Sequence, residues 1–135
     1  MRQNTTPTAL LCMPPGEARN AVRAALMAMN VVPQDVLPSR AELEQLAHTL
    51  HTDPHCVAII DLAGVRHAAA HIVALAGLLP SLEARQRTLL TRPQHGLWAA
   101  DRAWAQALGF ADLVAQLDAV SLGAEFNPVL GWIAG

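Results

Sequence analysis

One carboxylate stands out among the residues that could do chemistry. Asp61 lies at the end of an otherwise apolar run, Cys56–Leu62 (CVAIIDL). A charge that is buried without compensation is costly, so a carboxylate in this setting needs a hydrogen-bonding partner or a function. Two interpretations are open: Asp61 caps the turn or helix that follows it, or it has a present or former role in binding or catalysis.

The six histidines raise the question of a metal site. His67 and His71 are four residues apart, a spacing that can bind Zn²⁺ from one helix face, but no Glu accompanies them in an HExxH pattern. His48, His51 and His55 lie around a predicted helix end and a proline-containing loop. We expect these side chains to be solvent-exposed or helix-terminal, and we predict no metal site.

The usual signatures of enzymes are missing from the sequence. None of the three serines lies in a GxSxG turn, and neither a GxGxxG nor a Walker-type phosphate loop is present. Cys12 and Cys56 lie in apolar, strand-like segments, where a free cysteine packs as a small hydrophobic residue. We therefore expect two reduced cysteines, no cofactor and no enzymatic activity. A small enzyme that uses Asp61 as a general base is an alternative from a different class.

Composition narrows the class of protein further. The 135 residues are 53% hydrophobic and carry a net charge of −2, without runs of charge, which gives no footprint for nucleic acid or an anionic membrane. All nine basic residues are arginine, so the chain has no lysine. No apolar run reaches the roughly 18 residues that a membrane span needs. With no signal-peptide pattern at its start, we expect a cytoplasmic protein.

Apolar patterning predicts alternating strands and helices. Short apolar segments bounded by turn residues predict five strands: 8–13, 31–37, 56–62, 88–91 and 111–115. Helical spacing of apolar residues and a capping residue at Ser39 predict helices between them: 17–30, 39–50, 66–79 and 97–108. Gly109 suits the position that follows the last of these helices. Asn127-Pro128 suggests a short helix over 128–134.

Strands that alternate with helices through short loops favour a parallel sheet with helices on both faces, which is a three-layer α/β fold. Because the chain has no internal repeat, linker or low-complexity segment, we expect one domain over 1–135. Ligands of such sheets bind beyond the carboxyl ends of the strands. Those ends are Met13 or Pro14, Asp61, Thr91 and about Gln116.

At these strand ends the chain resembles the receiver domain of bacterial two-component response regulators, the CheY-like fold. Asp61 takes the place of the phosphoacceptor aspartate, and Thr91, thirty residues later, takes the place of the switch Ser/Thr. The passage from Ala103 to Ala115 is also similar to the family. The resemblance covers about 8–119 and implies a doubly wound, flavodoxin-like sheet with strand order 2-1-3-4-5. A helical or irregular tail over 120–135 would follow this core.

Two departures separate the chain from active receivers. Receivers hold Mg²⁺ with a pair of acidic residues after the first strand, where this chain has Met13 and Pro14, which offer none of the oxygen ligands that Mg²⁺ requires. Receivers end the fifth strand with Lys-Pro, where this chain has about Gln116-Leu117 and no lysine to take that place. Phosphoryl transfer depends on such positive charge. The resemblance therefore implies a degenerate receiver, or pseudo-receiver, that acts in signal transduction through protein–protein interaction.

The three tryptophans are candidate interface residues. Trp98 and Trp104 lie on the predicted helix 97–108, and Trp132 lies in the tail. About 240° of helical rotation separates Trp98 from Trp104, so they cannot share one narrow stripe. In receivers this helix, the fifth strand and the fifth helix form the usual dimer face, where an exposed tryptophan would be an anchor. We expect a protein partner such as a regulator, a kinase or an output domain. A homodimer that forms through this helix, the fifth strand and the tail is a further expectation. Burial of both helix tryptophans against the sheet is the alternative.

Another signalling fold remains as an alternative. The sequence CVAIIDLAGV over 56–65 also resembles a strand of STAS domains, the anti-sigma-factor antagonist type. The STAS motif continues to an Asp-Ser pair, whereas this chain continues with His67 and three alanines. A STAS domain has a mixed sheet, and a receiver has an all-parallel one. Sheet order therefore discriminates between the two.

Overall fold

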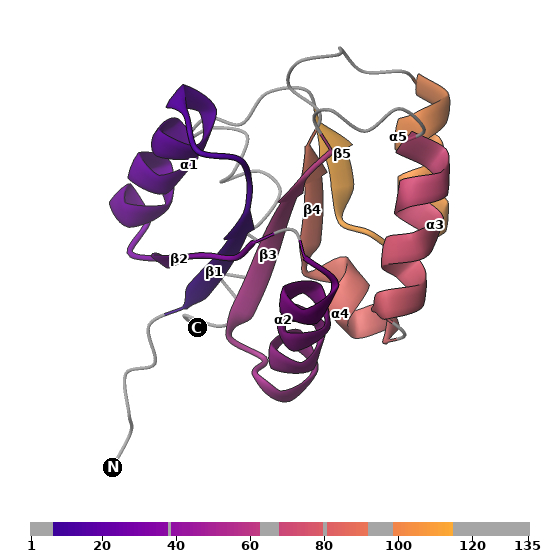
Figure 1. The fold of residues 1–135 in the computed structure, drawn as a ribbon, viewed down its shortest axis with the longest axis horizontal. Helices are drawn as coiled ribbons and strands as arrows, with labels where there is room; N and C mark the ends of the chain where they lie inside the picture. Colours follow the sequence, from indigo (N-terminus) through magenta and orange to yellow (C-terminus); the bar gives the residue numbers. More distant parts are fainter. Residues whose placement is uncertain (1–6, 38, 63–67, 80, 92–98, 115–135) are drawn as a thin grey trace.

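The computed structural model describes residues 7–37, 39–62, 68–79, 81–91 and 99–114 (Figure 1). Over these ranges strands and helices alternate almost throughout. In chain order they are β1 (Thr8–Cys12), α1 (Glu17–Ala28), β2 (Val32–Asp35), α2 (Arg40–Thr52), β3 (Cys56–Asp61), α3 (Ala68–Leu78), α4 (Leu82–Gln86), β4 (Thr88–Thr91), α5 (Ala99–Ala107) and β5 (Asp112–Val114). No described helix is both long enough and apolar enough to cross a lipid bilayer.

The strands form one parallel sheet in the order β2-β1-β3-β4-β5. This confirms the strand order expected from the receiver resemblance, and it is not the mixed sheet expected of a STAS domain. At the centre, β3 is paired on both sides, and every residue from Cys56 to Ile60 is at most 2% exposed. A continuous apolar run is what a parallel strand covered on both faces requires.

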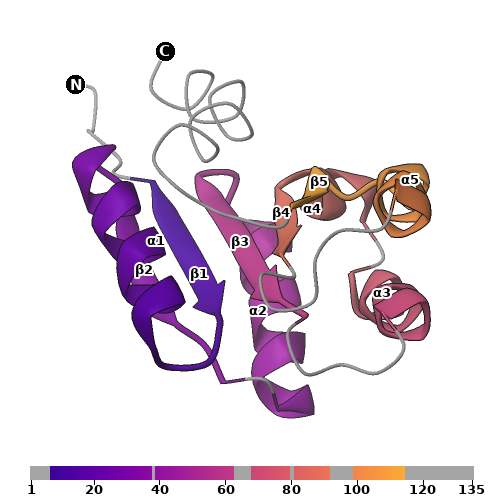
Figure 2. The same cartoon turned by 90° about the horizontal axis from the view of Figure 1, so that it is seen from above.

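Helices cover both faces of the sheet, which gives the expected three layers (Figure 2). On one face, α1 packs through Val22, Ala25 and Leu26 against alternate residues of β1 and β3. On the other face, residues of α2, α3, α4 and α5 share a second hydrophobic cluster with the intervening strand residues. Neighbouring residues of a strand belong to different clusters because side chains alternate between the two faces.

Capping residues set the helix boundaries. Ser39 precedes α2 as predicted, and its hydroxyl accepts a hydrogen bond from the Glu42 N–H at 3.2 Å. Ser81 caps α4 in the same way. The sequence pattern does not foresee α4, because five residues are too few to show a helical period. After α5, Gly109 adopts a φ of 95°, the left-handed conformation for which glycine is favoured at that position. The predicted tail helix lies outside the described residues.

A buried arginine ties the amino ends of β3 and β4 to α2. Arg87 lies between α4 and β4 and is 5% exposed. Its guanidinium donates hydrogen bonds to the carbonyl oxygens of Asp53 at 2.8 Å and Cys56 at 2.7 Å, and also to that of Leu50. These carbonyls belong to the end of α2 and the start of β3. The arginine thus satisfies helix-terminal acceptors and places a positive charge at the negative end of the helix dipole.

One edge of the sheet is poorly suited to pairing with a further strand. Alternate residues of β2 direct their backbone groups toward β1: the N–H of Val32 donates to Pro7 O, and that of Val36, directly after β2, donates to Leu11 O. The backbone of Pro33 therefore faces away from the sheet. Because proline has no N–H, the open edge lacks a donor at this residue, which disfavours the addition of a strand.

Replacing Arg87 with alanine is expected to lower the free energy of unfolding by about 3 kcal/mol or more, because three carbonyl groups lose their donor and a cavity opens. Urea titration at neutral pH measures this loss. Arg40→Ala is the matched control, since that side chain is 84% exposed and, among the described residues, pairs with Glu44; its change should stay within about 0.5 kcal/mol. Similar losses for both variants would show that Arg87 is not an anchor of the fold.

Candidate functional site

The structure brings together three of the strand-end residues singled out from the sequence. Asp61 ends β3 and Thr91 ends β4, and the strand register pairs them directly. Cys12, the last residue of β1, pairs with Ile60, so Met13, which follows β1, continues this register beside Asp61. Met13, Asp61 and Thr91 thus lie at the carboxyl edge of three neighbouring strands. Gln116, the fourth predicted position, lies outside the described residues.

The residue beside Asp61 is part of the hydrophobic core. Met13 is 5% exposed and belongs to the α1-side cluster with Leu11, Val22 and Leu26. Pro14, which follows it, is exposed. A thioether in apolar packing and a proline ring supply neither negative charge nor hard oxygen ligands. Met13 and Pro14 therefore do not supply the kind of ligand that Mg²⁺ requires.

The two polar residues of the edge differ in their accessibility. Thr91 is 1% exposed, whereas Asp61 is half-buried. The N–H of Leu62 donates to the carbonyl oxygen of Thr91 at 2.7 Å, so the pairing of the two chain segments extends beyond Asp61. The carboxylate is thus the more accessible group, with the threonine packed directly beside it.

Cys12 lies on the opposite face of β1 from Met13, because side chains alternate along a strand. Burial raises the pKa of the Cys12 thiol to about 11, with the Asp61 carboxylate as a smaller cause. Burial likewise raises the pKa of Cys56 to about 12; Asp53 adds to this rise and Arg87 opposes it. Both thiols are therefore protonated and unreactive at neutral pH.

The two cysteines cannot form a disulfide with each other in this fold. Cys56 pairs with Thr8 and Cys12 pairs with Ile60, so the cysteines are four residues apart along neighbouring strands. At about 3.3 Å per residue, this separation is roughly 13 Å, whereas a disulfide requires Cα atoms within about 7 Å. The predicted pair of free core cysteines is confirmed.

The exposed tryptophan of α5 lies on a helix that a buried carboxylate holds in place. Trp104 is 45% exposed. Asp112, at the start of β5, is 3% exposed and accepts two hydrogen bonds at 2.8 Å from the Arg102 guanidinium and one at 3.1 Å from Gln106. This bidentate pairing fixes α5 against β5. Trp98 and Trp132, the other predicted interface residues, lie outside the described residues.

Sequence reasoning missed the burial of two charged residues in the described part of the chain, Arg87 and Asp112. Arg102 and Gln106 are four residues apart and therefore share a helix face, and a carboxylate follows at the start of an apolar strand. That pattern is a usable indication of a link between α5 and β5. No comparable pattern marks Arg87, because an arginine between a helix and a strand is usually exposed.

The described histidines follow the prediction only in part. His48 and His51 are exposed on α2 as expected, whereas His55 is half-buried before β3, and within the described residues its Nδ1 is buried without a hydrogen-bond partner. His67 and the side chain of His71 lie outside the described part of the chain. Within the described ranges, no three side chains of His, Cys, Asp or Glu gather in a way that could hold a metal ion.

Stability above pH 9 is expected to depend on the two buried thiols, because the chain has neither lysine nor tyrosine. Both thiol pKa values in the folded state lie above the ordinary value of 9.0. The folded state therefore keeps the full stabilisation from its protonated thiols below pH 9, and loses it as the pH rises toward 11–12. We expect the free energy of unfolding to fall by roughly 2 kcal/mol per cysteine between pH 9 and pH 11. Urea titrations across this range measure the slope. Cys12→Ala and Cys56→Ala should each remove about half of it, and an unchanged slope in the double variant would contradict the assignment.

Comparison with known proteins adds one structural likeness. No protein-family model and no curated protein matches the chain. A solved structure that matches is the signal receiver domain of a modulated diguanylate cyclase from Desulfovibrio desulfuricans G20, described as an example of alternate folding. The two share 12% sequence identity and a TM-score of 0.56, over 96% of this chain and 97% of that one. At this identity the likeness concerns the fold alone. Together with the parallel strand order β2-β1-β3-β4-β5, it shows that this chain has the receiver, or CheY-like, fold.

Proposed function

We propose that this chain is an atypical receiver-like signalling domain that acts through protein–protein interaction and does not undergo aspartyl phosphorylation. The observation that carries the proposal is the burial of Met13 beside Asp61, at the position where receivers place a metal-binding acid. The side chain there contributes to core packing, so the edge keeps the carboxylate without the group that would hold a magnesium ion against it.

The chemistry of phosphoryl transfer supports the same conclusion. Charge that develops on the equatorial oxygens of the phosphoryl group must be neutralised by a metal ion or by positively charged side chains. Receivers use Mg²⁺ and a lysine for this purpose. The chain has no lysine, and the Thr91 hydroxyl can donate one hydrogen bond but carries no charge. Asp61 is therefore proposed to keep the phosphoacceptor position without the reactivity.

The proposal extends to the whole chain. Residues 1–135 are proposed to form one cytoplasmic domain of a bacterial two-component system, with a core over about 8–119 and a tail over 120–135. It is proposed to bind no cofactor, nucleic acid or membrane. A single cooperative transition in urea is the result expected of one domain.

Incubation with acetyl phosphate and Mg²⁺, followed by intact-mass measurement, tests the phosphorylation claim. We expect no stoichiometric gain of a phosphoryl group, because neither the metal nor the ammonium contact is provided. An active receiver domain from any source serves as the positive control under the same conditions. A Mg²⁺-dependent gain of one phosphoryl group that disappears in Asp61→Asn would refute the proposal.

Trp104 is the described residue best placed to contact a partner. An exposed tryptophan on a rigidly held helix is the type of residue that dominates binding energy at interfaces. The partner is proposed to be another protein of the same signalling system, or a second copy of this chain that meets it through α5, β5 and the tail. The interface residues predicted from the sequence, Trp98 and Trp132, are proposed to contribute to partner contacts as well.

Sedimentation velocity over a range of concentrations tests the homodimer, and Trp104→Ala tests its location. We expect the variant to weaken self-association at least about tenfold, since interface tryptophans are common hot spots. Leu37→Ala is the matched control, because Leu37 is also exposed, at 67%, but lies after β2. A wild-type chain that stays monomeric at every concentration would rule out the homodimer, and equal effects of the two variants would rule out the α5 face.

A further inference from the structure

Two arginines of α1 share one carboxylate of the edge strand. Arg19, Arg23 and Met27 follow one another at four-residue spacing, so they line one side of the helix. The Arg23 guanidinium donates a hydrogen bond to Asp35 Oδ1 at 2.5 Å, whereas the closest approach of Arg19 to Asp35 is 3.9 Å. In the described part of the chain, the Arg19 guanidinium makes no hydrogen bond, and its Nε is buried without a partner.

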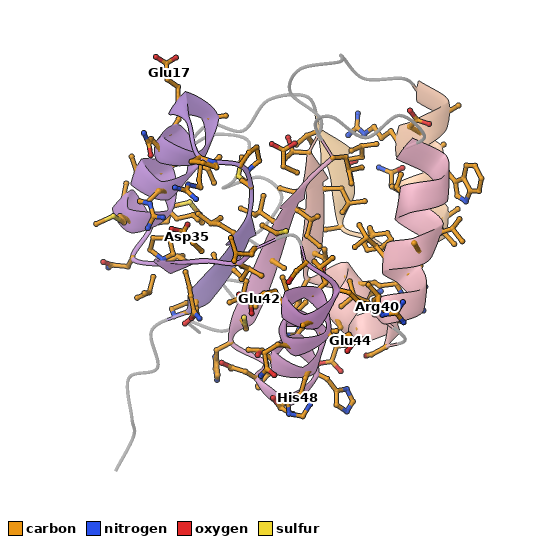
Figure 3. The ribbon with its side chains drawn as sticks, in the orientation of Figure 1. Glu17, Asp35, Arg40, Glu42, Glu44 and His48 are labelled. Carbon is orange, nitrogen blue, oxygen red and sulfur yellow. The ribbon has the colours of Figure 1, made fainter. Side chains whose placement is uncertain are left out.

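This arrangement leaves an excess of positive charge. Arg19 and Arg23 contribute two charges and Asp35 removes one, so the local sum is +1. Glu17, the acidic residue at the start of α1, projects away from Asp35 (Figure 3). The side chains of Arg19, Arg23 and Asp35 remain 24%, 32% and 44% exposed. A carboxylate from another molecule can therefore reach the cluster and accept hydrogen bonds from donors that Asp35 leaves unused.

An apolar depression lies next to this cluster. Its volume is about 260 Å³, and it is lined by Met27, Asn30, Val31, Val32 and Pro33. Met27 is 61% exposed and Val32 is 50% exposed, so the depression opens to solvent. At 1.5 Å per helical residue, Met27 lies about 6 Å along α1 from Arg23 and about 12 Å from Arg19. Three or four extended residues span that distance.

We propose that this side of α1, together with β2, docks a segment of a protein partner that carries a carboxylate and an apolar side chain three or four residues apart. The carboxylate pairs with Arg19 and Arg23, and the apolar side chain fills the depression. Because Pro33 leaves the open edge of β2 without one donor, the segment is recognised through side chains and not as an added strand. The surface lies at the opposite edge of the sheet from α5, and the inference holds whether or not Asp61 can be phosphorylated.

NMR of the full chain with ¹³C-methyl methionine tests the proposal. The probes are N-acetyl-Glu-Ala-Ala-Leu-amide and its reverse, N-acetyl-Leu-Ala-Ala-Glu-amide, and the controls carry Lys in place of Glu. We expect at least one acidic peptide to shift the methyl resonance of Met27 saturably, because that side chain is exposed beside the cluster. The resonance of Met13 should stay in place, since that residue is buried in the core. The lysine peptides should have no effect.

Arginine variants test whether peptide binding depends on the positive charge of the cluster. Arg19→Gln should weaken binding of the acidic peptide at least about fivefold, and so should about 0.3 M salt. Arg40→Gln, an exposed arginine on α2, should leave binding unchanged. No shift up to about 10 mM peptide, or equal shifts with acidic and basic peptides, would overturn the proposal. A Met27 shift that depends on protein concentration without any peptide would identify a second copy of the chain as the occupant, and would overturn it as well.

Discussion

The register between β3 and β4 is set at the amino end of the sheet, where Arg87 acts through both its backbone and its side chain. Its carbonyl oxygen accepts a hydrogen bond from the Ala58 N–H at 2.9 Å, while its guanidinium holds the carbonyl groups where α2 ends and β3 begins. From there the two strands advance together, so that Asp61 meets Thr91 three residues later. A slip of one residue would turn every side chain of a strand to the other face. The meeting of the two polar residues at the carboxyl edge thus depends on an interaction at the opposite end of the sheet.

Alternation along β1 separates two side chains that are adjacent in sequence. Met13 joins the α1-side core next to Asp61, and Cys12 joins the core on the other face. An acid in place of Met13 would have to be accommodated within apolar packing, where an uncompensated charge is costly. The fold is therefore compatible with an apolar residue after β1, because Met13 at that position contributes to the core.

The fold was largely accessible from the sequence, and particular residues show why. The apolar run of β3 and the cap at Ser39 can be predicted because each is determined by a few residues that are neighbours in sequence. The meeting of Asp61 and Thr91 required a topology as well, which the order of elements and the family resemblance supplied. Arg87 and Asp112 were not accessible, because their burial depends on acceptors and donors contributed by other elements. The difference between the short Arg23–Asp35 distance and the longer Arg19–Asp35 distance was not accessible either, since sequence spacing gives no distances between side chains on α1 and β2.

The proline on the outer side of β2 has a consequence for how copies of this chain can behave when crowded. Sheet-to-sheet growth, as in fibrils, needs an uninterrupted ladder of donors and acceptors along a free strand, and Pro33 breaks that ladder in a strand of only four residues. A chain with 53% hydrophobic residues is thereby protected at this edge from the least selective form of self-assembly. A molecule that binds at the outer edge of β2 must therefore be recognised through individual side chains, so a single substitution on this edge is enough to change which molecules bind.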